Sequence, residues 1–258
     1  MKITTWNVNS LTARLQHVLD WTPANPVDAL CLQELKLTED KFPHEALSEA
    51  GYAHCAVFGQ KTYNGVAILS RHPLRDVVRN INGFSDEHSR VIAATVDGPG
   101  GEVRLINGYF VNGQEPGSEK FEYKMSWLRG LHDYVRDELA THPRLILLGD
   151  FNIVPQDRDS YDPVGLRETI HHTTQERDHF RKLIELGLHD SFRMFEQPEK
   201  SYSWWDYRML GYQKNRGLRI DHILVSHSLQ PQVKSCSVDR TPRKWQKPSD
   251  HAPVTVEI

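Results

Sequence analysis

Two polar side chains end an apolar segment in the middle of the chain. In "LILLGDFNI" (145–153) the apolar residues stop at Gly149, and Asp150 and Asn152 follow on alternate positions. Because side chains two residues apart in a strand point to the same face, this spacing predicts a carboxylate and an amide side by side where a buried strand ends. Gly, Asp and Asn are also common in turns, so an ordinary turn is the alternative.

Similar polar residues stand where other predicted strands end or begin. The set comprises Asn7, Glu34, Asn107, Tyr109, Asp250 and His251. Asp221 lies within an apolar run, where an unpaired carboxylate is costly to bury, so it needs a cation, a histidine or backbone donors as its partner. Asn7 could instead cap the helix that follows it, and the pair before Pro253 could form a solvated turn. So many polar strand ends in one chain favour a single polar cluster at one edge of the sheets.

The residue types in this cluster suit a hard metal ion and phosphate chemistry. The candidate oxygen ligands are carboxylates and amides, namely Glu34, Asp150, Asp250, Asn7 and Asn152. Such a set matches Mg²⁺ or Mn²⁺ better than zinc, which would call for more His or Cys. His251 and Asp221 would form an imidazole oriented by a carboxylate. Hydrolysis of a phosphoester requires these groups: a metal for the charge, a base for the water and donors for the phosphate oxygens.

The elements that would carry these residues alternate between groups of strands and single helices. Strands are predicted at 2–8, 26–34, 64–70, 90–97, 102–110, 145–148, 218–226 and 252–258, and helices at 11–21, 118–139 and 173–188. The last helix begins with Thr173 and has Glu176 three residues later, which is a capping-box pattern. This order predicts a layered α/β fold with sheets inside and helices outside. The long irregular stretch 153–172 is of a length that is often functional.

The composition is that of an ordinary globular chain. Its 258 residues are 38% hydrophobic and carry a net charge of −3, and we expect one domain, 1–258, with a large core. Three cysteines (Cys31, Cys55 and Cys236) are too few and too widely spaced for a disulfide framework or a zinc cluster. No apolar stretch approaches the roughly 20 residues of a membrane span, and "MKITTWNVNS" is a strand pattern and no signal peptide. We therefore expect a soluble, cytoplasmic protein.

The near-neutral total charge argues weakly against a nucleic-acid partner. Its distribution weakens that argument, because residues 201–258 hold nine Lys/Arg against five Asp/Glu, a charge of +4, and the other residues carry −7. A basic end on an acidic body can bind a phosphate backbone. Scattered solubilising charge would give the same numbers.

Seven blocks of the sequence resemble those of one enzyme family. "TTWNVNS", "LCLQELK", "NGYFVNG", "LLGDFNI", "SWWDYR", "NRGLRIDHILVS" and "PSDHAPV" are similar, in this order from residue 4 to residue 254, to the signature blocks of the exonuclease III / abasic endonuclease family. The resemblance implies a DNase I-like, four-layered α-β-β-α sandwich of two mixed sheets flanked by helices. It also implies Mg²⁺-dependent hydrolysis of DNA phosphodiesters in base excision repair. The expected partner is double-stranded DNA with 3′ ends, nicks or blocked termini, bound by a monomer.

The resemblance also implies roles for single residues. Glu34 would bind the metal with Asn7 and Asp250 close by, and Asp150, Asn152 and His251 complete the candidate ligand set. Asp150 would position or deprotonate the attacking water. Asn152 would stabilise the phosphate, as would His251, which Asp221 holds in place. Tyr109 would bind a phosphate oxygen or assist the leaving group. The candidate DNA contacts are Trp204, Arg208, Asn215, Arg216, Arg219, Lys120 and Lys124. Core packing is the alternative for Trp204, and a solvated surface is the alternative for the others.

One loop departs from the family pattern. Before the helix that begins at Thr173, His171 and His172 stand where abasic endonucleases of the family have a small residue and an aromatic one, and Val111 and Asn112 replace a Pro-Gln pair. An imidazole at the small position would fill the pocket for a flipped-out abasic sugar. We therefore expect trimming of 3′ ends, by 3′–5′ exonuclease and 3′-phosphodiesterase or 3′-phosphatase action, with weak cleavage at internal abasic sites.

Three other functions remain open. The chain could be a full abasic endonuclease, if His171 points to solvent. A phosphatase or phospholipase of the same fold is a second alternative, against which the "RGLRID" and "SWWDYR" blocks argue. The third is a DNA-binding regulatory relative that has lost its catalytic site, against which the complete set of polar residues argues.

Overall fold

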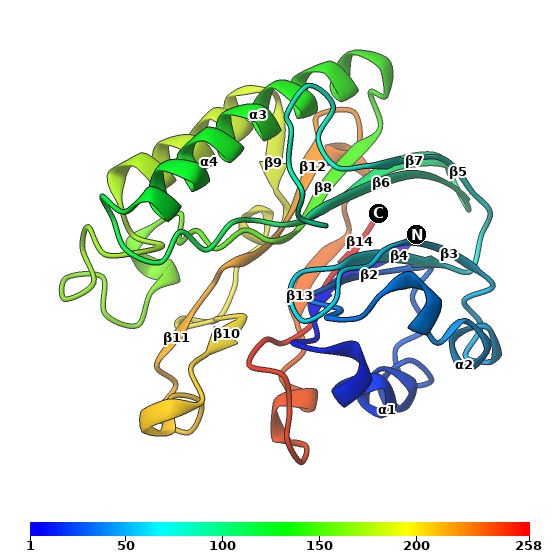
Figure 1. Ribbon diagram of the computed structural model, residues 1–258, viewed down its shortest axis with the longest axis horizontal. Helices are drawn as coiled ribbons and strands as arrows, with labels where there is room; N and C mark the ends of the chain where they lie inside the picture. The colour runs from blue at the N-terminus through cyan, green and yellow to red at the C-terminus, as the bar shows by residue number, and fades with distance from the viewer.

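The computed structural model describes residues 1–258 and contains two six-stranded sheets packed face to face, with helices on both outer faces (Figure 1). The first sheet has the order β13-β14-β1-β2-β4-β3, with β1 Lys2–Asn7, β2 Ala29–Gln33, β3 His54–Phe58, β4 Val66–Ser70, β13 Ser235–Val238 and β14 Val254–Glu257. The second has the order β5-β6-β7-β8-β12-β9, with β5 Leu74–Arg79, β6 Val91–Gly98, β7 Gly101–Tyr109, β8 Leu145–Asp150, β9 Leu188–Asp190 and β12 Asp221–Ser226. The predicted four-layered sandwich is confirmed.

Four α-helices cover the sheets. Helices α1 (Leu11–Trp21) and α2 (His44–Glu49) lie on the first sheet, and α3 (Glu119–Thr141) and α4 (Thr174–Glu185) lie on the second (Figure 1). A two-stranded ribbon of β10 (Trp204–Trp205) and β11 (Gly217–Leu218) projects from one end. The capping box of α4 is confirmed, because the Thr173 hydroxyl accepts from the Glu176 amide while the Glu176 carboxylate accepts from the Thr173 amide. None of the helices is both long enough and apolar enough to cross a membrane.

The apolar run of β8 shows why the inner strands carry no polar alternation. Ile146 and Leu148 face the first sheet and join the core between the sheets, whereas Leu145 and Leu147 face α3 and α4 and join the core beneath those helices. Because successive strand residues point to opposite faces, a strand covered on both sides must be apolar throughout. On β8 the one charged side chain, Asp150, therefore stands at the strand end.

Two parallel strand pairs bring those polar ends to one edge. In the first sheet β1 runs parallel to β2, with Asn7 opposite Gln33. In the second sheet β7 runs parallel to β8, with Tyr109 opposite Asp150. Strand β12 runs antiparallel to β8, so its first residue, Asp221, also lies opposite Asp150. The carboxyl ends of four strands and the start of a fifth therefore meet at the same rim.

Candidate active site

Three ionisable side chains from distant parts of the chain meet at this rim. One carboxylate oxygen each of Glu34 and Asp150 and one ring nitrogen of His251 all lie within 4.8 Å of one another. Glu34 follows β2, Asp150 ends β8 and His251 precedes β14. Asp150 and His251 are buried, whereas Glu34 is partly exposed. The sequence prediction placed all three in one cluster, and the structure does so too.

Asn7 joins the two carboxylates. Its Nδ2 donates to Glu34 Oε1 at 2.8 Å and to Asp150 Oδ2 at 2.9 Å, and its Oδ1 accepts from the Asn9 backbone amide at 2.9 Å. The prediction placed Asn7 close to the metal as a neutral oxygen ligand. In the structure its nitrogen faces the carboxylates, so it acts there as a donor that holds them together.

His251 is oriented by a buried carboxylate, as predicted for Asp221. The His251 Nδ1 lies 2.9 Å from Asp221 Oδ2, and the Ser203 hydroxyl donates to the same oxygen at 2.6 Å. The Nε2 lies 3.6 Å from Asp150 Oδ2. Burial opposes the charged imidazole, but the carboxylates of Asp221 and Asp150 outweigh it and raise the pKa of His251 well above its usual value. An imidazolium that donates is the form that this setting favours.

Burial disfavours the charged form of Asp150 too, and for a carboxyl group this raises the pKa. Burial is the largest cause that raises the pKa of Asp150; His251 opposes the shift, and repulsion from Asp221 and Glu34 adds to it. A divalent cation next to these carboxylates would relieve that repulsion. Two carboxylates that face each other in a partly closed site are hard oxygen ligands, so the donor set fits Mg²⁺ or Mn²⁺. The residues present therefore fit the metal that the sequence predicts.

Asp150 and Asn152 lie together for a reason other than strand alternation. Strand β8 ends at Asp150, and Asn152 has a φ of 49°, which is outside the strand region. The backbone amide of Asn152 donates to Asp150 Oδ1 at 3.0 Å, and its Nδ2 donates to the Phe110 carbonyl at 3.1 Å. The alternating-strand argument was wrong, because Asn152 lies beyond the strand in the irregular segment 151–155, where its amide bond to Asp150 keeps the two residues together.

Gly149 lies within β8 and permits the close approach of β7. Its φ is 141°, and an added Cβ would lie 1.9 Å from the carbonyl oxygen of Gly108 on the neighbouring β7. Any side chain at residue 149 would therefore push β7 and β8 apart directly beneath Asp150. The glycine that interrupts the apolar run thus allows the closest approach of the two strands that carry Tyr109 and Asp150.

Asp250 and Tyr109 flank the cluster. The oxygens of Asp250 accept from Asn9 Nδ2 and from Trp204 Nε1, both at 3.0 Å, and Asp250 is not part of the group formed by Glu34, Asp150 and His251. Burial, followed by the charges of Glu34 and Asp150, raises the pKa of Tyr109 well above its usual value. The Tyr109 hydroxyl is therefore a proton donor at neutral pH.

Two predicted DNA contacts are wrong. Lys124 is fully buried and forms an ion pair with Glu176. Arg219 is buried as well, and its guanidinium forms ion pairs with Asp159 and Asp190. Neither side chain can reach a DNA backbone, because both are enclosed by protein and their donors are already occupied.

The other predicted contacts lie at the surface. Arg208, Arg216 and Lys120 are exposed, and Arg208 pairs with Asp206. Asn215 is partly buried, and its side chain accepts from Trp205 and donates to the backbone of Lys200. Beside them the sequence analysis missed the exposed side chains of Tyr207, Met209 and Leu210, and it missed Ser203 and Asn9 within the site.

A cavity of about 660 Å³ lies next to the cluster, between the β10–β11 ribbon and the loop that precedes α4. Trp204, His171 and His172 all line it. His171 has a φ of 70°, and its Nδ1 donates to the Asn152 carbonyl at 2.7 Å. Burial, followed by the charge of Lys124, lowers the pKa of His171 to about 3, so this imidazole is neutral. His172 is buried and bonds the Ser160 hydroxyl.

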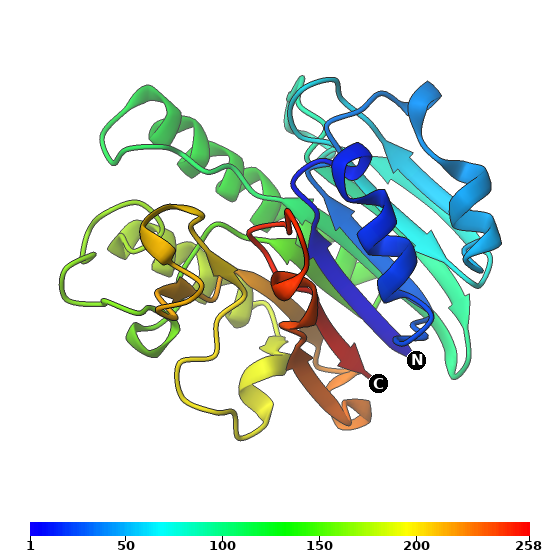
Figure 2. The same ribbon diagram turned by 90° about the horizontal axis from the view of Figure 1, so that it is seen from below.

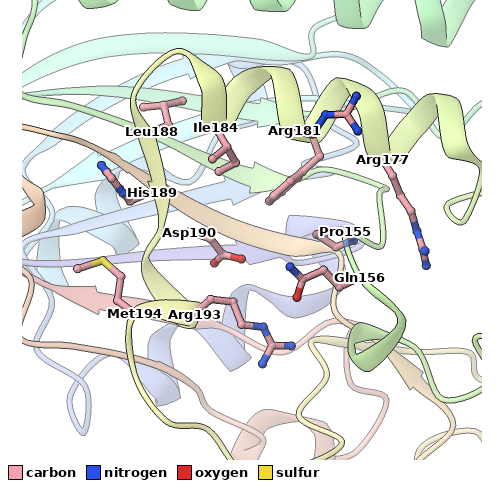
Figure 3. A pocket seen from close by; sticks show the side chains of 11 residues that line it. Pro155, Gln156, Arg177, Arg181, Ile184, Leu188, His189, Asp190, Arg193 and Met194 are labelled. Atoms are coloured by element: carbon pink, nitrogen blue, oxygen red, sulfur yellow. The ribbon is translucent and has the colours of Figure 1, made fainter.

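A second cavity, of about 490 Å³, lies between α4 and β9 and is lined by Arg177, Arg181 and Arg193, among others (Figure 3). Each of these arginines already pairs with a carboxylate. No member of the catalytic cluster lines this cavity. The first cavity is connected to the cluster through its lining residues, because Trp204 donates to Asp250 and His171 donates to the Asn152 carbonyl.

Comparisons with known proteins agree with this geometry. Residues 4–251 match the endonuclease/exonuclease/phosphatase family. The exodeoxyribonuclease III of Haemophilus influenzae is 33% identical, over 100% of both chains. A 3′–5′ exonuclease, NExo, from Neisseria meningitidis is 51% identical with a TM-score of 0.95, over 100% of this chain and 99% of that one. A variant of the Neisseria 3′ phosphatase NExo, bound to a product DNA hairpin, is 50% identical with a TM-score of 0.96, over 100% and 99% of the two chains.

Proposed function

Because the chain belongs to the endonuclease/exonuclease/phosphatase family, we propose that it is a hydrolytic nuclease of DNA repair that acts at the 3′ ends of double-stranded DNA. The observation that carries this proposal is that Glu34, Asp150 and His251 lie together in one cluster. Asp221 orients His251, and a cavity lined by Trp204 lies beside the cluster. The similar proteins named as a 3′–5′ exonuclease and a 3′ phosphatase support an action at 3′ termini. We propose further that residues 1–258 work as one domain and as a monomer.

Glu34 and Asp150 would hold a Mg²⁺ ion, which Mn²⁺ could replace. When bound, such an ion neutralises phosphate charge and favours an attacking hydroxide. Asp150 would also orient the attacking water and take its proton, as the buried carboxylate next to His251 and Asn7. Its other oxygen is held by the Asn152 backbone amide, which fixes the direction of the carboxylate.

The remaining polar groups would stabilise the phosphate. His251 carries a positive charge next to Asp150 and can donate from Nε2 to a phosphate oxygen, while Asp221 holds the opposite nitrogen. The protonated Tyr109 hydroxyl can donate to the phosphate or to the leaving oxygen. Trp204 would pack against the terminal sugar, since it borders the cavity and its Nε1 is fixed by Asp250.

A substrate panel tests the proposal. Duplexes with a plain 3′ end, a 3′-phosphate, a 3′-phosphoglycolate and an internal abasic site are incubated side by side, with Mg²⁺ or with EDTA. We expect shortening or unblocking of the 3′ ends with the metal and none with EDTA. Binding without cleavage would instead support a regulatory protein, and release of phosphate from small or lipid phosphoesters alone would support another branch of the fold.

Glu34→Gln is expected to lower activity by about 100-fold or more and to raise the Mg²⁺ concentration required for half-maximal rate. The reason is that the substitution removes one negative charge and one ligand from the metal site, while the amide keeps the shape of the side chain. The measurement is the rate of 3′-end trimming across a Mg²⁺ titration. Glu39→Gln, which changes an exposed carboxylate outside the site, is the control, and a normal rate at low Mg²⁺ for Glu34→Gln would remove Glu34 from the metal site.

His171 bears on which lesions are accepted. Its ring lines the cavity beside Trp204 and is fixed by its bond to the Asn152 carbonyl, so it does not point freely to solvent. An enzyme that cuts beside an internal abasic site must hold a flipped-out sugar in a close pocket. A 3′ terminus is flexible and can approach the phosphate site around an obstacle. We therefore propose that His171 restricts the enzyme to 3′ ends.

His171→Gly and His171→Ser are expected to increase cleavage at an internal abasic site by about 10-fold or more, while unblocking of a 3′-phosphoglycolate changes little. The glycine is compatible with the positive φ of this residue. Both substrates are measured with the same enzyme preparation, so a general loss of activity would affect both. Strong abasic cleavage by the unaltered protein would end this proposal and favour a full abasic endonuclease.

A further inference from the structure

The ion pair between Lys124 of α3 and Glu176 of α4 lies beneath the catalytic cluster and is completely enclosed by protein. The two helices lie side by side on the second sheet (Figure 1). A lysine ammonium has three N–H donors, and each finds an acceptor here: the Glu176 carboxylate and two backbone carbonyls. Burying two charges is costly unless all of their hydrogen bonds are made, so this arrangement depends on every partner staying in place.

The two carbonyls belong to loops that form the site. Lys124 Nζ donates to the Asn152 carbonyl at 2.7 Å and to the Asn112 carbonyl at 3.1 Å. Asn152 lies two residues after Asp150, the last residue of β8, and Asn112 lies three residues after Tyr109, the last residue of β7. The side chains of Asn112 and Asn152 also bond each other at 3.3 Å. One buried ammonium therefore fixes the loops that follow both parallel strands of the second sheet.

The carboxylate of Glu176 fixes a third loop. Its Oε1 accepts from the His171 backbone amide at 3.1 Å, and its Oε2 accepts from the amide and hydroxyl of Thr173. His171 in turn donates from Nδ1 to the Asn152 carbonyl, which is also an acceptor of Lys124. The capping box of α4 and the ion pair thus share the side chain of Glu176. Through it they hold His171, which lines the cavity beside Trp204.

We propose that Lys124 and Glu176 form a positioning unit that fixes Asn152, Asn112 and His171 around the reacting phosphate. The inference rests on the proposed nuclease function, because it assigns these two residues to the same site. Neither side chain touches the substrate, since both are fully buried. They act through the backbone atoms that they hold, and a displacement of a reacting group by about 1 Å can cost roughly 100-fold in rate.

A merely structural ion pair exists elsewhere in the molecule and supplies the comparison. Arg104 of β7 pairs with Glu138 near the other end of α3, and both side chains are largely buried. Arg104 also donates to the Asp76 carbonyl and to Thr95, which are not part of the site. Removing this pair should destabilise the same helix and the same sheet without moving a loop of the site.

The test compares Lys124→Met/Glu176→Gln with Arg104→Met/Glu138→Gln on a 3′-recessed duplex, at a temperature below the unfolding transition of each protein. Each double substitution removes both charges and keeps side chains of similar length, so no unpaired charge is left buried. We expect the first variant to lose kcat by about 10- to 100-fold with KM changed by less than about 3-fold, and the second to keep kcat within about 2-fold. Lys124→Arg, which keeps the charge and the donors, should retain most of the kcat that the Lys124→Met/Glu176→Gln variant loses.

Equal kcat in the folded Lys124→Met/Glu176→Gln variant and the parent would overturn the proposal, as would an equal loss in the Arg104 control. If the double variant does not fold, Lys124→Gln, whose shorter side chain reaches fewer of the acceptors, is measured against the parent by the same kcat criterion. Failure of the proposed function is a different result, because the unaltered protein would then show no metal-dependent trimming of 3′ ends.

Discussion

Asp150→Asn is expected to abolish the trimming of 3′ ends, with a loss of about 1,000-fold or more, while the binding of duplex DNA is retained. The substitution keeps the size of the side chain but removes both a metal ligand and the group that takes the proton of the water. The residue is buried against Asn7, His251 and the Asn152 amide, so another carboxylate has no room to replace it.

Stability separates this loss from misfolding. Burial and the neighbouring carboxylates disfavour the charged form of Asp150, so a neutral amide should leave the unfolding temperature of the metal-free protein unchanged or higher. The measurements are single-turnover cleavage, DNA binding and thermal unfolding of the same preparation. Asp137→Asn on the exposed surface of α3 is the control. Residual cleavage within about 10-fold of the parent would show that Asp150 is not the base.

His251→Asn and Asp221→Asn are expected to lower kcat by similar factors of about 100-fold or more, and the double variant should be little worse than either single one. Asp221 accepts from His251 Nδ1 and supplies the charge that keeps the imidazole protonated. An amide at residue 221 would lack that charge, and with its oxygen accepting from Nδ1–H the neutral imidazole would carry no proton on Nε2. His251 would then present a lone pair to the phosphate where a donor is needed.

The double-mutant cycle measures the coupling of the two residues. Losses that multiply in full would show that Asp221 and His251 act independently, which contradicts the assigned roles. Ser203→Ala supplies an intermediate case, because it removes one hydrogen bond to Asp221 and leaves the carboxylate in place. We expect this variant to lose activity by less than about 10-fold.

The sequence predicted the elements whose local signals and burial agree. Helix α1 has the predicted bounds, and the capping box placed the start of α4 correctly. Strands β3, β5 and β13 were missed. β5 carries mostly exposed side chains and a shift of register between Arg75 and Val78, and β13 is a four-residue edge strand with two exposed serines. β5 is a strand because it pairs with β6, and β13 is a strand because it pairs with β14. Neither segment has the periodic pattern of apolar residues that would predict this pairing.

The site was predicted better than the surface around it, for a physical reason. Strand ends follow from the apolar runs, and parallel neighbours end at the same edge, so Glu34, Asp150 and His251 could be grouped from the sequence. Lys124 shows the limit. It lies on the buried stripe of α3 with Phe121 and Leu128, at spacings of three and four residues, and this helical periodicity could have marked it as buried. Ser203 carried no signal, because its contact with Asp221 depends on how a distant loop packs.

The pairing of β14 has a consequence for how the protein is made. This strand lies between β13 and β1, beside the first strand of the chain, and the two chain ends lie side by side (Figure 2). Contacts between residues so far apart in sequence form late, because a long loop must close before they are gained. During synthesis on the ribosome, a nascent chain that stops short of residue 250 lacks both His251 and the strand that completes the first sheet. We therefore expect nuclease activity only after β14 has paired with β1 and β13, because the imidazole of the site precedes that strand.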